Sequence, residues 1–263
     1  MNSRLVIVTG ASGAVGQCFV DHFLPEDRTT CVAVSRSPME TEAVHCQVDL
    51  TDDVAVKQAI TQLDLDGIAD VILIHGVGKF KYEHECEFSS LGNTPEEVDD
   101  EIFSSNYQTF VNVAEPLIEK LNQEHQKGLK TTLALCAFGS ITDKYKIPFW
   151  RSYTYAKDSL RNYIKELSHS PEWEGLIRGR FINVSTTDTG NENKLRPEAT
   201  AEEKQYWLKP IKIVRNSIEA LKCLTPLWQE IDIYEPMPDF DPKTYYTDYQ
   251  QIQEKWERQM GLR

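Results

Sequence analysis

The residue pair best suited to chemistry is Tyr153 and Lys157, which are four positions apart in a segment of helical periodicity. This spacing places both side chains on one face of a helix. A phenol has a pKa of about 10 and therefore exchanges protons poorly at neutral pH. A phenolate and an ammonium ~4 Å apart at an effective dielectric of about 20 attract each other by about 4 kcal/mol, which corresponds to roughly three pKa units. Lys157 is therefore predicted to lower the pKa of Tyr153; the alternative is a chance pairing on an exposed helix. Tyr155 is a poorer candidate, because the residue four positions after it is Ser159.

A glycine-rich turn near the start of the chain provides a candidate phosphate site. The apolar segment 5–9 reads as a strand, and three glycines follow it directly before a segment of helical periodicity. Glycines at such a turn let the backbone approach a pyrophosphate, and the N–H groups at the helix start bind the anion. The alternative, an ordinary glycine-rich turn, is disfavoured by its position at the first strand of an alternating α/β chain. The residues predicted to bind the dinucleotide here are Gly10, Ser12, Gly13, Val15 and Gly16.

The residues after the second predicted strand distinguish between the two nicotinamide dinucleotides. A carboxylate there would bind the adenosine 2′-hydroxyl, whereas an arginine accommodates a 2′-phosphate. The chain has Ser35, Arg36 and Ser37 at this point and no acid, so the sequence favours NADP(H) over NAD(H). The alternative is that Arg36 is a solvated loop residue. Asp49 and Leu50, directly after the predicted third strand, are placed where an adenine could lie.

Short apolar segments alternate with longer segments of helical period, which predicts a doubly wound α/β fold with a parallel sheet covered on both faces. The link 35–47 between the second and third strands has little apolar periodicity, which predicts a short or absent helix there. Farther along the chain, the start of a helix is predicted by Thr94, Pro95 and Glu97. The expected strands with stated bounds lie at 5–9, 31–34, 71–74, 132–137, 180–184 and 231–234, and the third strand in chain order is expected directly before Asp49.

We expect a single domain of the Rossmann type over residues 1–235, followed by a C-terminal extension over 236–263 with a short helix. The apolar stripe of that helix consists of Tyr249, Ile252, Trp256 and Met260. Such a stripe has to be covered, either by its own domain or by another subunit, which leaves a homo-oligomer open.

A serine and an asparagine complete the set of candidate catalytic residues. Ser140 follows the strand 132–137 at the carboxyl edge of the sheet, where α/β proteins bind ligands. The glycine loop, Ser140 and the Tyr153-x-x-x-Lys157 pair, in this order, resemble the short-chain dehydrogenase/reductase family over residues 4–235. The resemblance implies that Tyr153 exchanges the proton, that Ser140 hydrogen-bonds the same substrate oxygen, and that Lys157 tunes Tyr153 and holds the nicotinamide ribose. Asn106 matches the family's fourth catalytic residue, which holds a water in a proton relay.

Two segments depart from the family's pattern. The usual Asn-Asn-Ala-Gly after the fourth strand is replaced by a segment beginning at His75, and the usual Pro-Gly after the sixth strand is absent. These departures keep dinucleotide binding as the expectation and leave the substrate class open. The interval 189–209 is expected to form a mobile substrate lid, the alternative being a permanently packed helix. The family residues expected to line the ribose and the nicotinamide correspond to His75, Gly76, Val77, Thr186, Thr187 and Thr189.

The composition narrows the range of partners. The 28 Lys and Arg against 41 Asp and Glu give a net charge of −13, which argues against a nucleic acid or an anionic membrane. No apolar stretch of the sequence reaches the roughly 18 residues needed to span a bilayer. Six cysteines without a Cys-x-x-Cys pair suit reduced thiols in a cytoplasmic protein. The histidines have no metal-ligand spacing, so no metal site is expected.

Together these features predict an NADPH-dependent reductase that transfers hydride to a carbonyl, or to a conjugated enone, of a small-molecule substrate, with Tyr153 as proton donor. Two alternatives stay open: an NAD(P)-dependent alcohol dehydrogenase working in the reverse direction, and a non-catalytic NADP(H)-binding regulator. The presence of Ser140, Asn106 and Lys157 beside Tyr153 argues against the regulator.

Overall fold

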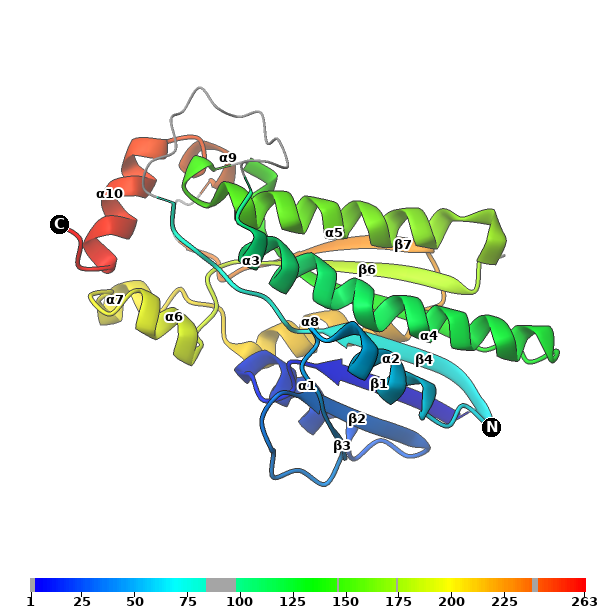
Figure 1. Ribbon diagram of the computed structural model, residues 1–263. Helices are drawn as coiled ribbons and strands as arrows, with labels where there is room; N and C mark the ends of the chain where they lie inside the picture. Colours follow the sequence, from blue (N-terminus) through cyan, green and yellow to red (C-terminus); the bar gives the residue numbers. More distant parts are fainter. Residues whose placement is uncertain (1–2, 84–97, 146, 174, 238–240) are drawn as a thin grey trace.

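The computed structural model describes residues 3–83, 98–145, 147–173, 175–237 and 241–263 of the chain (Figure 1). The described strands are β1 (Ser3–Thr9), β2 (Thr29–Ser35), β3 (Val44–Gln47), β4 (Ile68–His75), β5 (Thr132–Ser140), β6 (Ile177–Val184) and β7 (Trp228–Ile233). The α-helices are α1 (Ala14–Phe23), α2 (Asp53–Thr61), α3 (Asp100–Phe103), α4 (Thr109–Gln126), α5 (Arg151–His169), α6 (Gly190–Leu195), α7 (Ala201–Lys204), α8 (Pro210–Lys222), α9 (Pro242–Tyr245) and α10 (Tyr249–Gln259). Shorter turns are the π-helical η2 (Ser104–Gln108) and the 3₁₀ turns η3 (Ile141–Tyr145), η4 (Pro148–Trp150) and η5 (Pro171–Trp173).

The described strands form one seven-stranded parallel sheet in the order β3-β2-β1-β4-β5-β6-β7. The chain builds outward from β1 to β3 and then crosses back to place β4 on the other side of β1. Connections leave β1 and β4 in opposite directions, so a crevice opens at their carboxyl ends, where α/β proteins bind ligands. This order confirms the doubly wound fold predicted from the sequence, in a single domain.

Helices cover both faces of the sheet (Figure 1). Phe19 of α1 and Val214 of α8 are buried against one face, while Val56 of α2, Phe110 of α4 and Leu160 of α5 are buried against the other. The central strands β1, β4 and β5 each contain a continuous buried apolar segment because both faces of the sheet are covered. All six strands expected from the sequence are present with ends that differ by up to three residues, and no helix is described between β2 and β3.

The long helical segment before β5 carries one irregular turn. Asp99 starts it, because its Oδ1 accepts the N–H groups of Glu101 and Ile102 at 3.0 and 3.1 Å. The π-helical turn η2 then joins α3 to α4; such turns are frequent at functional sites. The predicted helix start at residues 94–97 lies outside the described residues.

The C-terminal segment folds over the carboxyl edge of the sheet (Figure 1). Ile252 of α10 is 1% exposed, and the rings of Trp256 and Trp150 are 4.8 Å apart between centroids. Phe80, which follows β4, lies 5.5 Å from the Trp256 ring. The apolar stripe of α10 is therefore covered by its own domain at Ile252 and Trp256.

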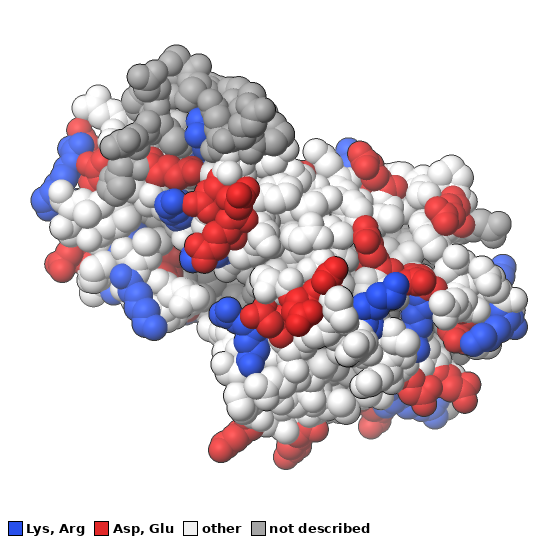
Figure 2. All heavy atoms as spheres, in the orientation of Figure 1, with Lys and Arg blue, Asp and Glu red and all other residues white. Residues whose placement is uncertain are grey.

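The surface carries charges of both signs. Acidic and basic side chains are interspersed on the face drawn in Figure 2, and acids exceed bases by 13 over the whole chain. Among the described residues, no helix has the length and apolar character needed to cross a membrane.

Candidate active site

The glycine turn after β1 has the geometry of a phosphate-binding loop. Gly10 has a φ of +67°, and a Cβ on it would lie 2.7 Å from the carbonyl oxygen of Gly76, so this turn packs directly on the backbone that follows β4. A Cβ on Gly16 would lie 2.3 Å from the carbonyl oxygen of Gly10, so α1 needs glycine to come this close. Gly13 is the N-cap of α1, and it has no side chain that could accept the first N–H groups of the helix. The first-turn N–H groups, with exposed Ser12 beside them, are thus available to an anion.

At the end of β2, Ser35 and Arg36 are placed differently. Ser35 is buried, and its hydroxyl donates to the Ser37 carbonyl oxygen over 2.6 Å and lies 3.0 Å from Nε2 of His45. That hydroxyl therefore shapes the turn. Arg36 is exposed at the end of the strand, so its guanidinium is the group that can reach a ligand.

The two residues predicted to lie near an adenine follow β3. Hydrogen bonds from Thr51 hold the pKa of Asp49 below its usual value, and the nearby charge of Arg36 acts in the same direction. Leu50 is 6% exposed, and its carbonyl oxygen accepts Nδ2 of Asn112 at 2.8 Å. Arg36 and Asp49 thus interact electrostatically at this end of the predicted site.

A cavity of about 240 Å³ lies at the carboxyl ends of β4 and β6, beside the start of α1. Most of the residues predicted for the ribose, the nicotinamide and the chemistry meet in its wall. Ser140 and Thr186 do not line it, and the remaining predicted residues lie at the glycine turn or at the ends of β2 and β3. The predicted residues that line the cavity are Val15, His75, Gly76, Val77, Asn106, Tyr153, Lys157, Thr187 and Thr189.

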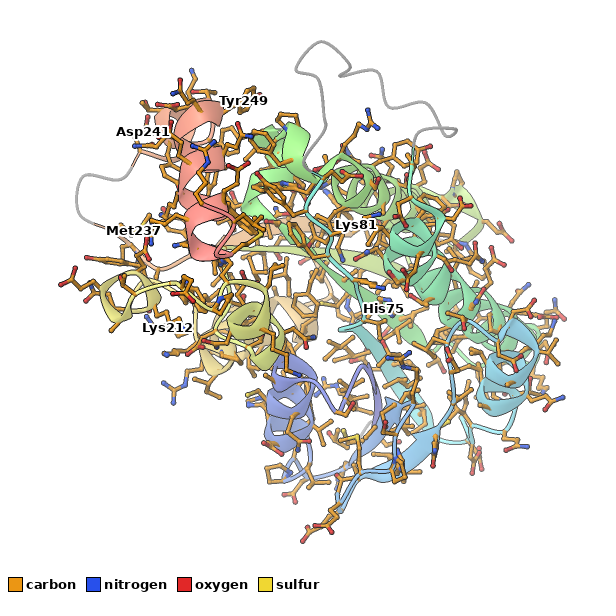
Figure 3. The ribbon with its side chains drawn as sticks, turned by 60° about the vertical axis from the view of Figure 1, so that its left-hand side comes forward. His75, Lys81, Lys212, Met237, Asp241 and Tyr249 are labelled. Carbon is orange, nitrogen blue, oxygen red and sulfur yellow. The ribbon has the colours of Figure 1, made fainter. Side chains whose placement is uncertain are left out.

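His75 ends β4 inside the molecule (Figure 3). Its Nδ1 lies 2.8 Å from the hydroxyl of Thr9 and its Nε2 lies 3.3 Å from that of Thr109. Burial lowers the pKa of His75 to about 3, and the charge of Lys157 adds to the effect. The imidazole is therefore neutral at physiological pH, and it links β1 to α4 instead of carrying a charge.

Tyr153 and Lys157 lie on one face of α5, and Nζ of Lys157 is 5.3 Å from the centroid of the Tyr153 ring. Burial lowers the pKa of Lys157 to about 8; Asp143 opposes this shift and Arg161 adds to it. Burial raises the pKa of Tyr153 far above its usual value; Asp143 and Glu192 add to this rise and Arg161 opposes it. The predicted lowering of the Tyr153 pKa by Lys157 is therefore wrong for this structure, because desolvation of the phenolate outweighs the attraction of the ammonium.

Asn106 is held in the π-helical turn η2. Its Nδ2 donates to the carbonyl oxygens of Lys79 and Ile102 at 2.7 and 2.8 Å. Its buried Oδ1 has no hydrogen-bond partner within the part of the chain that the structure describes. A Cβ on Gly78 would lie 2.5 Å from this Oδ1 and 3.4 Å from Nζ of Lys157, so the unused acceptor and the lysine both lie beside Gly78.

Ser140 is the last residue of β5, where it pairs with Val184 of β6. Its backbone N–H donates to Oδ2 of Asp143 over 2.9 Å. The side chain of Asp143 is fully buried and forms an ion pair with Arg161 at 2.6 Å. The turn that follows β5 is thus tied to α5 by a charged side chain.

The threonines after β6 have backbone and capping roles. The carbonyl oxygen of Thr186 accepts the N–H of Leu208 at 2.7 Å, and the hydroxyl of Thr187 donates to the carbonyl oxygen of Ser185 at 3.0 Å. Thr189 caps α6, because its hydroxyl accepts the N–H of Glu192 at 3.2 Å. The interval 189–209 begins at this cap and forms α6 and α7; its mobility stays a prediction.

A larger cavity of about 570 Å³ opens at the same edge of the sheet, between the ends of β6 and β7 and the helices α7 and α10. Thr186, Trp207, Tyr234 and Trp256 are among its walls. Arg196 is 2% exposed and lies between two tryptophan rings, 4.8 Å from the centroid of Trp207 and 4.2 Å from that of Trp256. The interval 189–209 is therefore joined to α10 by an arginine between two rings.

Sequence reasoning missed several residues around Tyr153. Phe80 packs edge-on against the Tyr153 ring at 5.4 Å between centroids, and Trp256 contacts Phe80 in turn. Trp256 belongs to the apolar stripe predicted for the C-terminal helix, but nothing in the sequence connects it to Tyr153. No sequence pattern indicates the ion pair between Asp143 and Arg161, because the two residues meet only when η3 folds back on α5.

The profile of the family described as short chain dehydrogenase matches residues 4–200. The chain therefore belongs to the short chain dehydrogenase family, whose members are oxidoreductases that use NAD(H) or NADP(H). Among curated proteins, no match is found.

Solved structures of this family share the fold at low sequence identity. Ligand-free aldohexose dehydrogenase from Thermoplasma acidophilum is 15% identical with a TM-score of 0.68, covering 92% of this chain and 98% of that one. A short chain dehydrogenase from Burkholderia cenocepacia in complex with NADP is 15% identical with a TM-score of 0.65, covering 97% and 98%. A 4-hydroxyisoleucine dehydrogenase complexed with NADH is 17% identical with a TM-score of 0.65, covering 91% and 100%. At these identities the likeness establishes the fold.

The residues of this chain fit a dinucleotide. The start of α1 offers N–H groups without a side-chain cap from Gly13, and the contacts of Gly10 and Gly16 bring the backbone close to the ends of β1 and β4. The unused Oδ1 of Asn106 lies at the other end, beside Lys157. The candidate anion site and the candidate proton-exchange site thus lie along one edge of the sheet.

Proposed function

We propose that the protein is an NADPH-dependent reductase that acts on a carbonyl, or on a conjugated enone, of a small-molecule substrate. The observation that carries the proposal is the meeting of Tyr153, Lys157 and Asn106 in one cavity next to the glycine turn. The dinucleotide supplies the hydride when bound. Tyr153 donates the proton to the substrate oxygen, and Ser140 hydrogen-bonds that oxygen as negative charge develops on it.

The other polar residues of the cavity support this proton transfer. Because burial brings the pKa of Lys157 to about 8, its side chain is mostly protonated at neutral pH and can both hydrogen-bond the ribose and return a proton to Tyr153. The unused Oδ1 of Asn106 accepts a water in that path. His75 takes no part in this proton transfer, because its two ring nitrogens already lie within hydrogen-bond distance of the Thr9 and Thr109 hydroxyls and its pKa of about 3 makes it a weak base.

The preference for NADP(H) is part of the proposal. An exposed Arg36 follows β2, and the sequence has no acid there to bind a 2′-hydroxyl. A charge-assisted contact to the 2′-phosphate contributes about 1 to 3 kcal/mol. We therefore expect NADPH to bind more tightly than NADH, with Arg36→Ala removing most of the difference.

Fluorescence titration of the parent protein and of Arg36→Ala with both dinucleotides tests this preference. Arg215→Ala, which removes an exposed guanidinium from α8, is the matched control and should leave both affinities unchanged. Equal affinities for NADPH and NADH in the parent protein would refute the preference.

Alcohol oxidation by the same residues is the reverse reaction, and its direction follows from the redox state of the dinucleotide pool. A non-catalytic NADP(H)-binding regulator is the second candidate, favoured by the raised pKa of Tyr153. It predicts dinucleotide binding without turnover of any substrate. A cytoplasmic location is proposed because Cys31 and Cys136 are buried free thiols.

A further inference from the structure

A buried carboxylate connects the end of β5 to α5. The side chain of Asp143 is fully buried; its Oδ2 accepts the N–H of Ser140 at 2.9 Å, and its Oδ1 accepts Nη2 of Arg161 at 2.6 Å. One carboxylate thus fixes both the backbone of Ser140 and a side chain of the helix that carries Tyr153. Arg161 is four residues after Lys157 on that helix, so it lies on the same face.

The strand makes room for this carboxylate with a glycine. A Cβ on Gly139 would lie 2.3 Å from Cε1 of Phe181, 2.7 Å from Oδ1 of Asn183 and 2.9 Å from Oδ2 of Asp143. No other residue type fits at this position without displacing the carboxylate or the Phe181 ring. The approach of Asp143 to the N–H of Ser140 is therefore built into β5.

The guanidinium of Arg161 is fixed from several sides. Its Cζ lies 4.6 Å from the centroid of the Phe181 ring. The guanidinium also forms ion pairs with Asp158 of its own helix and, at 3.3 Å, with Glu230 of β7. Four elements, η3, α5, β6 and β7, hold this charge in one place.

We propose that Asp143 and Arg161 are positioning residues for the proposed reaction, which hold the Ser140 turn against α5 and set the electrostatic potential at Tyr153 and Lys157. Neither Asp143 nor Arg161 lines the cavity that contains Tyr153 and Lys157. The role of the pair in catalysis rests on the proposed function. The effect of its two charges on the pKa of Lys157 does not depend on that function.

The charged groups that face the two residues come from several elements. Asp143 and Glu192 of α6 raise the pKa of Tyr153, and Arg161 lowers it. Asp143 also raises the pKa of Lys157, and Arg161 lowers that one too. Each member of the pair therefore acts on Tyr153 and Lys157 with the opposite sign to its partner.

The remaining charged or titratable neighbours do not reverse the direction in which Asp143 and Arg161 shift the pKa of Lys157. His75 of β4 faces Lys157 but is neutral, with a pKa of about 3. Asp158 faces Asp143 and Arg161, and Glu230 faces Arg161. Removing the negative charge of Asp143 should therefore lower the pKa of Lys157, and removing Arg161 as well should raise it again.

The first test measures the pKa of Lys157 without any substrate. Competitive labelling with acetic anhydride across a pH series, read by mass spectrometry, reports the fraction of neutral amine. In Asp143→Asn, which keeps an acceptor for the Ser140 N–H, we expect the pKa of Lys157 to fall from about 8 by roughly one unit. The double variant Asp143→Asn/Arg161→Met should return it part of the way.

Asp158→Asn is the matched control, because it removes the same charge from another partner of Arg161 that does not contact Ser140. It should leave the pKa of Lys157 within about 0.3 units of the parent value. A shift in Asp143→Asn no larger than in Asp158→Asn, or a further fall in the double variant, would overturn the proposal.

The second test uses turnover of a carbonyl substrate with NADPH. The return of a proton to Tyr153 needs protonated Lys157, and Asp143 keeps that proton on Lys157 to higher pH. In Asp143→Asn the loss of kcat with rising pH should therefore begin at lower pH, with KM changed little. An unchanged pH profile would overturn the catalytic part of the inference. If the pKa of Lys157 shifts as expected but neither the parent nor any variant reduces a carbonyl compound, the electrostatic effect of the pair is confirmed and the proposed reductase function is refuted.

Discussion

Replacing Gly10 with alanine should cost more stability than the same change at another glycine of equal backbone conformation. Gly10 has φ +67° and Gly67 has φ +69°, so each Gly→Ala change places an alanine in the left-handed region at about 1 to 2 kcal/mol. At Gly67 the new Cβ meets no atom of the described residues within 4 Å. At Gly10 it would lie 2.7 Å from the carbonyl oxygen of Gly76 and 2.9 Å from its carbonyl carbon, and such overpacking adds about 1 to 3 kcal/mol.

Urea unfolding of the two variants measures this difference. Gly10→Ala should lower the free energy of unfolding by about 2 to 5 kcal/mol, and Gly67→Ala by about 1 to 2 kcal/mol. Because the extra cost comes from the contact between the phosphate turn and the backbone after β4, Gly10→Ala should also weaken NADPH binding, whereas Gly67→Ala should not. Equal destabilisation by the two substitutions would refute the contact between Gly10 and Gly76 as the cause.

Three further predictions follow from buried and exposed positions. Burial holds the pKa of His75 at about 3 against an ordinary value of 6.5, so the stability linked to its neutral form is present above pH 6.5 and is lost as the pH falls toward 3. Between pH 6.5 and 5 the free energy of unfolding should drop by about 2 kcal/mol more in the parent than in His75→Gln, and an equal drop would contradict the assignment. Ile252→Ala should cost about 2 to 5 kcal/mol, whereas Leu262→Ala, at a side chain that is 53% exposed, should stay within about 0.5 kcal/mol; similar melting temperatures would show that α10 is not docked. Tryptic cleavage after exposed Lys194 should slow when NADPH and a reducible carbonyl are both present, and the lid hypothesis fails if the rate is unchanged.

The local parts of this fold could be predicted from the sequence. The inner strands contain short apolar segments because both faces of the sheet are covered, and Tyr153 and Lys157 share a face because they are one helical turn apart. The glycine turn was recognisable because it directly follows the first strand. These features depend on residues that are close together in the chain, and a sequence pattern records the order and spacing of such residues.

The parts that depend on tertiary contacts could not be predicted in this way. The sign of the Tyr153 pKa shift was missed because burial by Phe80 and its surroundings outweighs a charge that the spacing alone suggests. Ser35 looked available for a phosphate, but His45 approaches it from β3. Asp143 and Arg161 are 18 residues apart, and only the packing of η3 on α5 brings them together.

The most direct test of the account is turnover of NADPH with a panel of aldehydes, ketones and enones, measured for the parent protein, Tyr153→Phe and Tyr155→Phe. We expect the parent and Tyr155→Phe to reduce at least one carbonyl compound, and Tyr153→Phe to bind NADPH normally while losing several orders of magnitude in kcat, because only the proton donor is removed. Near-normal turnover by Tyr153→Phe, or loss of turnover in Tyr155→Phe alone, would contradict the assignment of Tyr153 as the proton donor.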